Sequence, residues 1–249
     1  MRFLLPGGEG RILLHDQLTL QPRLQMLADM VPCGSIVADI GTDHGYLPVW
    51  LLQEGRIPRA IASDIHAKPL EHARETAAEF GVSDRIEFRL CAGLDGFVPI
   101  EVDTIVIAGM GGETIASILE GAPWTREDGV LLLLQPMTKT EYLRIWLADK
   151  GYHFTEERLV SDKSFLYPIL CVKGGEARAL TLEESYGGLL LDKDPLWEQY
   201  LSQQMKKIRI RMEGLTHSEN CTAKDEIKTL CDLHDALASR KERLHDNGT

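Results

Sequence analysis

Short apolar segments alternate with helix-like segments through the first two thirds of the chain, and this alternation is the strongest constraint on its fold. Five of the segments have strand length and are mostly apolar, which is typical of parallel strands that are buried on both faces. They are residues 35–40, 60–63, 86–90, 102–108 and 130–134, and helical segments at 46–53, 69–81, 113–119 and 141–150 lie between and after them. The pattern predicts an α/β fold with a doubly wound, Rossmann-like sheet.

Further patterns flank this region. Residues 17–32 have helical periodicity, and Thr138 with Glu141 has the spacing of a capping box. Residues 152–160 and 166–172 are expected to form two strands joined by the polar turn Ser161–Ser164. Such a hairpin would add an antiparallel strand near one edge of the sheet, which favours the methyltransferase variant of the fold over the dinucleotide-binding variant.

The pattern changes after about residue 180. Apolar residues recur at helical spacing on both sides of a polar turn, Thr216–Asn220, which predicts a helical hairpin whose two apolar stripes pack together as in a coiled coil. We therefore expect a loosely attached N-terminal extension at 1–16, a cofactor-binding domain at 17–184 and a hairpin at 185–249 that is a candidate RNA-binding appendage.

Charge and composition restrict the function further. The formal net charge is −11, of which residues 1–184 carry −10 and residues 185–249 carry −1. A polyanion would be repelled by the body, so its binding would need a local basic cluster, and the tail offers Lys206, Lys207, Arg209 and Arg211. The alternative is that this cluster is simply the solvated face of a helix.

No segment has the length and apolarity of a membrane-spanning helix, and the first residues do not resemble a secretory signal. The five cysteines are widely spaced and suit reduced thiols rather than disulfides or metal ligands. These features predict a cytoplasmic protein without a bound metal. A monomer is favoured, although the oligomeric state stays open.

The turn after the first strand carries the most specific chemistry, in the sequence Asp39-Ile40-Gly41-Thr42-Asp43-His44-Gly45-Tyr46. Gly41 and Gly45 allow a tight turn and a close approach of the backbone to a ligand. Asp43 would repel the pyrophosphate of a dinucleotide, whereas Asp39 and Asp43 together would attract a cationic ligand such as S-adenosylmethionine. Asp43 would alternatively cap the following helix.

The ends of the other strands extend the candidate site. Asp64 can accept the hydroxyls of a ribose or cap the next helix, and Ala92 offers only its backbone. Three glycines at 109, 111 and 112 would leave an open floor beside a reactive methyl group, unless they form only a plain turn, and Gln135 could hydrogen-bond a base edge. The cofactor-binding candidates are Asp39, Gly41, Asp43, Gly45, Asp64, Ile65, Ala92, Gly93, Ala108 and Gly109, and the catalytic candidates are Asp43, His44, Gly109, Met110 and Gln135.

Three segments together resemble a known family. They are Asp39-Ile40-Gly41-Thr42-Asp43-His44-Gly45-Tyr46-Leu47-Pro48, Ile107-Ala108-Gly109-Met110-Gly111-Gly112, and Leu134-Gln135-Pro136 with Leu143-Arg144-Ile145-Trp146-Leu147, and they are similar to the bacterial tRNA (adenine-N1)-methyltransferases of the TrmK family. The chain departs from the family pattern at Ala92 and Met137. The resemblance implies a class I S-adenosylmethionine-dependent fold and methylation of adenine N1 in the D-arm of tRNA, at position 22. It also implies a C-terminal helical hairpin that helps to hold the tRNA. We expect the tail and Arg23 to contact the phosphates of the tRNA.

Adenine N1 carries a free lone pair, so its methylation needs no general base, and catalysis would come mostly from proximity and orientation. Asp43 and His44 are the polar residues that we expect nearest to the reacting base. His44 could instead be a packed or capping residue. Tyr46 could stack on a base or pack in the core. A target in a helical arm must be swung out of its stack. Two alternatives stay open, a methyltransferase that acts on a small molecule or a protein and a non-catalytic nucleoside-binding module. A nicotinamide dehydrogenase is disfavoured by Asp43.

Overall fold

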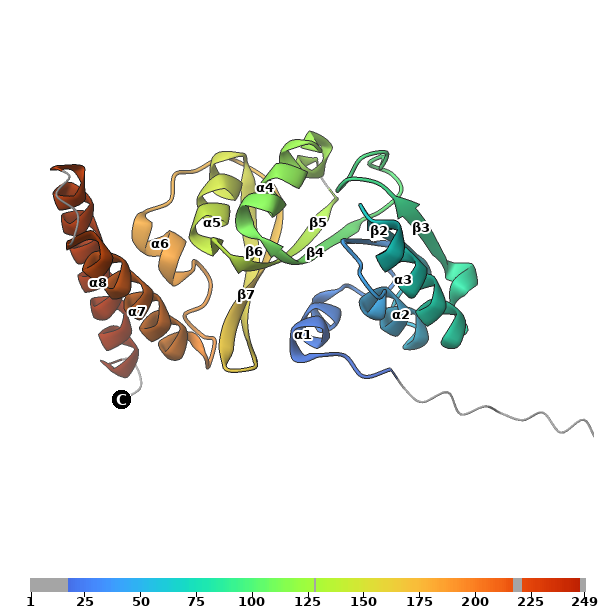
Figure 1. Cartoon of the computed structure of the whole chain (residues 1–249), viewed down its shortest axis with the longest axis horizontal. Helices are drawn as coiled ribbons and strands as arrows, with labels where there is room; N and C mark the ends of the chain where they lie inside the picture. Colours follow the sequence, from blue (N-terminus) through green and yellow to red (C-terminus); the bar gives the residue numbers. More distant parts are fainter. Residues whose placement is uncertain (1–17, 128, 217–220, 247–249) are drawn as a thin grey trace, which may run out of the picture.

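The computed structural model describes residues 18–127, 129–216 and 221–246 of the chain. A seven-stranded mixed sheet forms its centre, with helices on both faces and a helical hairpin at one end (Figure 1). The strand order is β3-β2-β1-β4-β5-β7-β6. The predicted extension at 1–16 and residues 217–220 of the predicted turn lie outside the described residues.

The first five strands are parallel, as the alternating pattern predicts. They are β1 (Val37–Ile40), β2 (Ala60–Asp64), β3 (Ile86–Leu90), β4 (Thr104–Gly111) and β5 (Leu131–Thr138). The order reverses between β1 and β4, and ligands of open α/β sheets bind beyond the carboxyl ends of the strands at such a reversal. The strand β4 continues three residues and β5 four residues beyond their predicted ends, and Ala108, Gly109 and Met110 of β4 border this region.

Buried side chains on the two faces of the sheet explain why the inner strands are mostly apolar. Along β4, Val106 belongs to one apolar cluster, while its neighbours Ile105 and Ile107 belong to the other. The helices α1 (Pro22–Met30), α2 (Tyr46–Gln53) and α3 (Ala67–Glu79) cover the first face, and α4 (Gly112–Glu120) and α5 (Thr140–Asp149) cover the second. The strands β1, β2, β4 and β5 thus bury apolar side chains in both directions, whereas the edge strand β3 contributes to the first cluster only.

The predicted hairpin is present and longer than expected. Its strands β6 (Tyr152–Asp162) and β7 (Phe165–Gly174) pair antiparallel, and β7 lies between β5 and the edge strand β6. Lys163 and Ser164 make the turn with φ of 48° and 73°. Two successive residues with positive φ are the signature of the turn that matches strand twist.

Two predicted details at helix starts are wrong. The helix predicted at 17–32 spans only Pro22–Met30, because Pro22 occupies its first turn. Thr138 does not cap α5, since Thr138 ends β5 and the helix follows Lys139, which has a φ of 58° and no side-chain capping bond. A true capping box instead joins Thr181 and Glu184 at the start of α6 (Leu182–Gly187).

The C-terminal helices α7 (Trp197–Thr216) and α8 (Cys221–Asp246) lie side by side as the predicted hairpin (Figure 1). The contacts of Arg211 with Glu226 and of Lys241 with Ser202 show that the two helices are antiparallel. An apolar cluster that includes Tyr200, Ile208, Leu230 and Leu237 holds them together. The predicted domain boundary at residue 184 falls inside α6, and the division into domains stays a prediction.

A buried polar cluster connects the helical hairpin formed by α7 and α8 to the sheet. Arg144 of α5 pairs with Glu157 of β6 at 2.8 Å, and both side chains are fully buried. The Arg144 guanidinium also donates to the Ser185 carbonyl and to the Tyr200 hydroxyl. These contacts fix α6 and α7 against α5 and the edge of the sheet.

Candidate functional site

The turn after β1 is held tightly against β2. The backbone N–H groups of Gly41 and Thr42 both donate to the carbonyl of Ser63, at 2.8 and 3.0 Å. Gly41 and Gly45 have φ of 74° and 69°, which glycine adopts without strain, and Asp43 has a φ of 51°. Gly45 rather than Asp43 is the N-cap of α2, and the Asp43 carboxylate, whose Oδ1 lies 3.7 Å from His44 Nε2, is largely exposed and can face a ligand.

Asp39 is a buried carboxylate beneath this turn. Its Oδ2 accepts a hydrogen bond from the Thr42 hydroxyl at 2.6 Å. Burial raises the pKa of Asp39 from 3.8 to about 6, the Thr42 hydroxyl opposes this rise, and the charge of Asp64 adds to it. A buried carboxylate with a raised pKa is stabilised by a cationic ligand, so the residues present fit a ligand that carries an ammonium or sulfonium group.

A first cavity of about 340 Å³ lies across the ends of β1, β2 and β3. Of the predicted cofactor residues, Gly41, Asp64, Ile65, Ala92 and Gly93 line it. Asp64 Oδ1 accepts the backbone N–H of His66 at 2.8 Å, while His66 itself is the N-cap of α3. The second carboxylate oxygen of Asp64 therefore suits a ribose hydroxyl.

A second cavity of about 450 Å³ opens on the other side of the turn. Its lining joins Asp39, Gly41, Asp43, His44, Tyr46, Ala108 and Gly109 to Arg23 of α1. Because Gly41 lines both cavities, an elongated ligand can lie in the first and present its end to the second. The structure thus brings together the predicted residues of the first turn and of the fourth strand.

Met110 lies over Gly41 at the junction of the two cavities. A Cβ atom built on Gly41 would lie 2.2 Å from Met110 Cε, and Met110 lines the first cavity. The side chain of Met110 thus fills the space that the missing side chain of Gly41 leaves. Since methionine adapts readily to its surroundings, Met110 can adjust to a bound ligand.

Replacing Gly41 by alanine is expected to lower both stability and cofactor affinity. The φ of 74° would cost alanine about 1–2 kcal/mol, and the new methyl group would push Met110 into the first cavity. We expect at least a tenfold weaker binding of S-adenosylmethionine in calorimetry, using about 1.4 kcal/mol per factor of ten. The double variant with Met110→Ala should recover affinity but not stability. Wild-type affinity in Gly41→Ala would contradict this account.

Only one of the three glycines in the predicted floor opens into a cavity. Gly109 has a φ of 77°, and a Cβ built on it would meet no described atom within 4 Å. By contrast, a Cβ on Gly112 would lie 2.3 Å from the Lys139 carbonyl oxygen, so Gly112 is required by backbone packing. Gly109 lies in a register shift between β4 and β5, an irregularity that is common next to active sites.

Gln135 does not offer its amide to a base edge in this structure, because it is fully buried and its amide has other partners. Its Oε1 accepts from the Gly109 N–H at 3.2 Å and from Arg23 Nη1 at 2.9 Å. Its Nε2 donates to the Pro136 carbonyl. Gln135 therefore supports the floor of the second cavity from below.

Arg23 is likewise held by neighbours that the sequence did not reveal. Its Nε donates to Asp162 of β6 at 2.8 Å, and its guanidinium carbon lies 5.5 Å from the centre of the Tyr167 ring. These contacts tie α1 to the β-hairpin formed by β6 and β7, at the edge of the second cavity. No motif signals them, because the partners are 139 residues apart in the chain.

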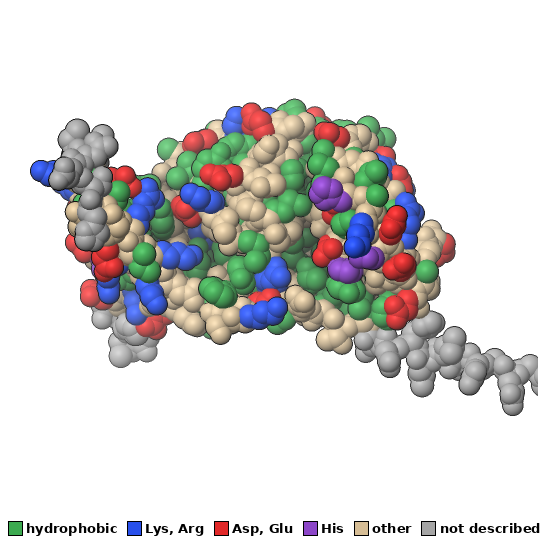
Figure 2. All heavy atoms as spheres, in the orientation of Figure 1, with side chains coloured by type: hydrophobic (Ala, Val, Ile, Leu, Met, Phe, Trp, Pro, Cys, Tyr) green, Lys and Arg blue, Asp and Glu red, His purple; other side chains and the backbone are tan. Residues whose placement is uncertain are grey.

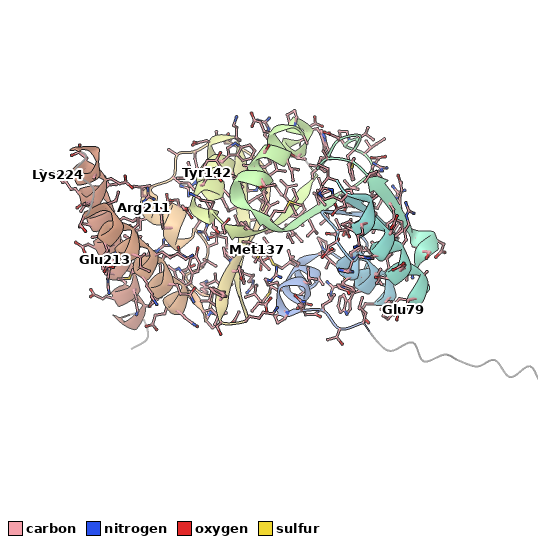
Figure 3. All side chains as sticks on the ribbon, in the orientation of Figure 1. Glu79, Met137, Tyr142, Arg211, Glu213 and Lys224 are labelled. Carbon is pink, nitrogen blue, oxygen red and sulfur yellow. The ribbon has the colours of Figure 1, made fainter. Side chains whose placement is uncertain are left out.

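The basic candidates of the tail lie on α7 and are exposed. Arg211 pairs with Glu226 at 2.6 Å, which compensates its charge, whereas no such pair involves Lys206, Lys207 or Arg209 among the described residues. Figure 2 shows Lys and Arg side chains on the hairpin beside a band of hydrophobic side chains on the body. In Figure 3, Met137 lies between Arg211 and the end of the body that carries Glu79.

The described part of the chain holds neither a cluster of metal-ligating side chains nor a membrane-spanning helix. No group of three or more His, Cys, Asp or Glu residues there has a geometry suited to a metal ion. None of the helices described is long and apolar enough to cross a membrane.

Comparisons with known proteins agree with this geometry. Residues 20–170 match the family model described as a methyltransferase domain. A tRNA (adenine(22)-N(1))-methyltransferase of Bacillus subtilis is 30% identical over 207 residues, which are 82% of this chain and 85% of the relative.

Two solved structures are similar over most of their length. The B. subtilis m1A22 tRNA methyltransferase TrmK has a TM-score of 0.80 and 28% identity, covering 89% of this chain and 98% of its own. The Streptococcus pneumoniae protein Sp1610 in complex with S-adenosyl-L-methionine has a TM-score of 0.74 and 32% identity, covering 87% of this chain and all of its own. The similarity extends through the sheet and into the C-terminal helices.

Proposed function

The chain belongs to the methyltransferase-domain family and, within it, to the tRNA (adenine-N1)-methyltransferases, and on this premise we propose that it methylates N1 of an adenine in tRNA, with S-adenosylmethionine as the donor. The observation that carries the proposal is the acidic turn after β1, which joins two cavities at Gly41. The family resemblance seen in the sequence is confirmed, as are the fold and the donor that it implied.

The residues of the chain divide the binding of the donor between them. We propose that Asp64 holds the ribose, that the backbone around Ala92 and Gly93 borders the base of the donor, and that Asp39 binds its ammonium group. S-adenosylmethionine supplies a methyl group on a positively charged sulfur, which makes that methyl electrophilic. Gly41 allows the donor to pass from the first cavity into the second, where Gly109 leaves space for the acceptor base.

Adenine N1 has a lone pair and no proton in the neutral base, so no group of the protein has to remove a proton before attack. The residues of the second cavity have to position the base and exclude water, and such positioning can supply several kcal/mol of rate enhancement. Gln135 and Arg23 hold the floor of the cavity at Gly109. A paired adenine must leave its helix to reach this floor.

The direct test is methyl transfer to unmodified bulk tRNA from labelled S-adenosylmethionine, followed by digestion and nucleoside analysis. The expected product is 1-methyladenosine, and the same nucleoside should decrease in tRNA from cells that lack the protein. Methylation of another nucleoside, of protein or of a small molecule would contradict the proposal. Binding of tRNA without methyl transfer would instead favour a non-catalytic module.

We propose that the hairpin contributes to tRNA binding through Lys206, Lys207 and Arg209. Replacing all three by alanine is expected to weaken tRNA binding by about tenfold at moderate salt. The number of counterions released on binding, obtained from the slope of log affinity against log salt concentration, should fall by two to three, because each lysine or arginine neutralises about one phosphate. Fluorescence anisotropy at several salt concentrations measures both. The affinity for S-adenosylmethionine should stay unchanged, and an unchanged salt slope would show that α7 is only a solvated helix face. A cytoplasmic location, where tRNA is found, belongs to the same proposal.

A further inference from the structure

We propose that Asp43 and the stacked rings of Tyr46, His44 and His72 form a subsite for a positively charged purine. This subsite would stabilise the charge that adenine acquires while it is methylated. The inference rests on the proposed function and adds to it a role for residues that border the acceptor rather than the donor.

The reaction moves a positive charge into the second cavity. The N1 lone pair of adenine forms the new N–C bond, and the electron pair of the broken S–C bond returns to the sulfur. The sulfur becomes a neutral thioether and the base becomes the 1-methyladenine cation, so the net charge is conserved. Groups near the base stabilise the transition state more than the ground state, which is the requirement for catalysis.

Asp43 is placed to interact with that cation. It lines the second cavity together with Gly109, and its side chain is 73% exposed, whereas Asp39 is buried beneath the same turn. Both carboxylates line the second cavity, but they differ in exposure. Asp39 lies at its buried end, beneath the turn, and Asp43 lies at its exposed end, where a base would enter from solvent.

Three aromatic rings form a column beside Asp43. The His44 ring stacks on Tyr46, with ring centres 5.2 Å apart and planes 10° apart, and on His72, at 4.9 Å and 4°. Tyr46 is 39% exposed and lines the second cavity, so it can extend the column by one more base. An aromatic face attracts a cation more strongly than a neutral ring, which favours the methylated base over the unmethylated one.

Arg23 lines the same cavity, and its own positive charge would disfavour a cationic base if it were unpaired. The Arg23 guanidinium is paired with Asp162 at 2.8 Å and donates to Gln135 at 2.9 Å. Its charge is thus compensated by Asp162. The exposed Asp43 carboxylate and the buried Asp39 carboxylate remain as negatively charged groups in the lining of this cavity.

The test measures how strongly the full-length protein, saturated with S-adenosylhomocysteine, binds two tRNA transcripts that carry adenosine or 1-methyladenosine at the methylated position. The wild type should bind the methylated transcript more tightly. Asp43→Asn, which keeps a residue that tolerates positive φ, should reduce the ratio of the two affinities about fivefold, and so should Tyr46→Leu. Tyr46→Phe keeps the ring and should keep the ratio. Glu79→Gln removes a charge from the far end of α3 and should also leave the ratio unchanged (Figure 3).

Effects of the methyl group on RNA pairing cancel, because every variant is compared on the same two transcripts. Ratios for Asp43→Asn and Tyr46→Leu within about twofold of the wild type would overturn the inference. That result would leave the proposed function intact if the wild type still forms 1-methyladenosine in tRNA. Failure of the wild type to methylate tRNA would contradict the proposed function itself, so the two failures are distinguishable.

Discussion

Asp39→Asn is expected to make the unliganded protein more stable at pH 8 and to weaken its binding of S-adenosylmethionine by at least about 30-fold. The loss of affinity, about 2 kcal/mol, is typical of the removal of one partner from a buried charge pair. The gain in stability has a different origin. The Asp39 carboxylate is buried and has no positively charged partner among the described residues that contact it, so its ionisation destabilises the folded chain.

The pH dependence follows from the raised pKa of Asp39. Because the pKa is 3.8 in the unfolded chain and about 6 in the folded chain, the native state binds more protons between these values. Stability therefore falls as the pH rises through this window, and the full cost, on the order of 3 kcal/mol, is present above the folded pKa. Asparagine avoids this cost.

Urea unfolding at several pH values and calorimetric titration measure both effects. The advantage of Asp39→Asn over the wild type should shrink as the pH falls from 8 towards 4, and Glu79→Gln, which alters an exposed carboxylate, should show no such trend. Equal affinity of the wild type and Asp39→Asn for S-adenosylmethionine would refute the assignment of Asp39 to the donor.

Arg144→Met is expected to lower the free energy of unfolding by about 3–5 kcal/mol, because it leaves the Glu157 carboxylate buried without its cation. Glu157 keeps only the backbone N–H groups of Leu189 and Leu190, which donate to its Oε2. Burial by itself lowers the pKa of Arg144, but the Glu157 carboxylate and Tyr200 more than offset this, so the net pKa is raised. The guanidinium therefore stays charged at all ordinary pH values.

Urea unfolding followed by circular dichroism measures this change. Arg158→Ala is the matched control, since it removes an arginine of β6, the strand that carries Glu157, and its pair with Glu156 is exposed on both sides; it should cost less than about 1 kcal/mol. A loss of similar size in the two variants would mean that the Arg144 cluster contributes little. Lysine at position 144 should recover only part of the loss, because it lacks the guanidinium fork.

Local patterns predicted most of the sheet, because the inner strands bury apolar residues on both faces and leave nearly continuous apolar runs in the sequence. They also predicted the β-hairpin formed by β6 and β7, whose polar turn stands out between two apolar strands. They failed at the start of α1 and at the N-cap of α5. Thr138 and Glu141 have capping-box spacing, but β5 continues through Thr138, so pairing with β4 overrode the local preference.

The candidate site was predictable where chemistry depends on neighbours in the chain. Asp39, Gly41 and Asp43 share one turn, and glycine and aspartate there already indicate a cationic ligand. The contacts of Arg23 with Gln135 and Asp162 were not predictable, because they join residues that only the strand order brings together. The same is true of Met110 over Gly41 and of the aromatic column that includes His72.

The contact between Arg23 and Asp162 also orders events during synthesis of the chain. Arg23 leaves the ribosome early, and its partner follows 139 residues later, on the strand that forms the sheet edge. The residues of the donor turn are therefore synthesised well before the residue that anchors Arg23. The support of the acceptor cavity cannot be complete until β6 has been made.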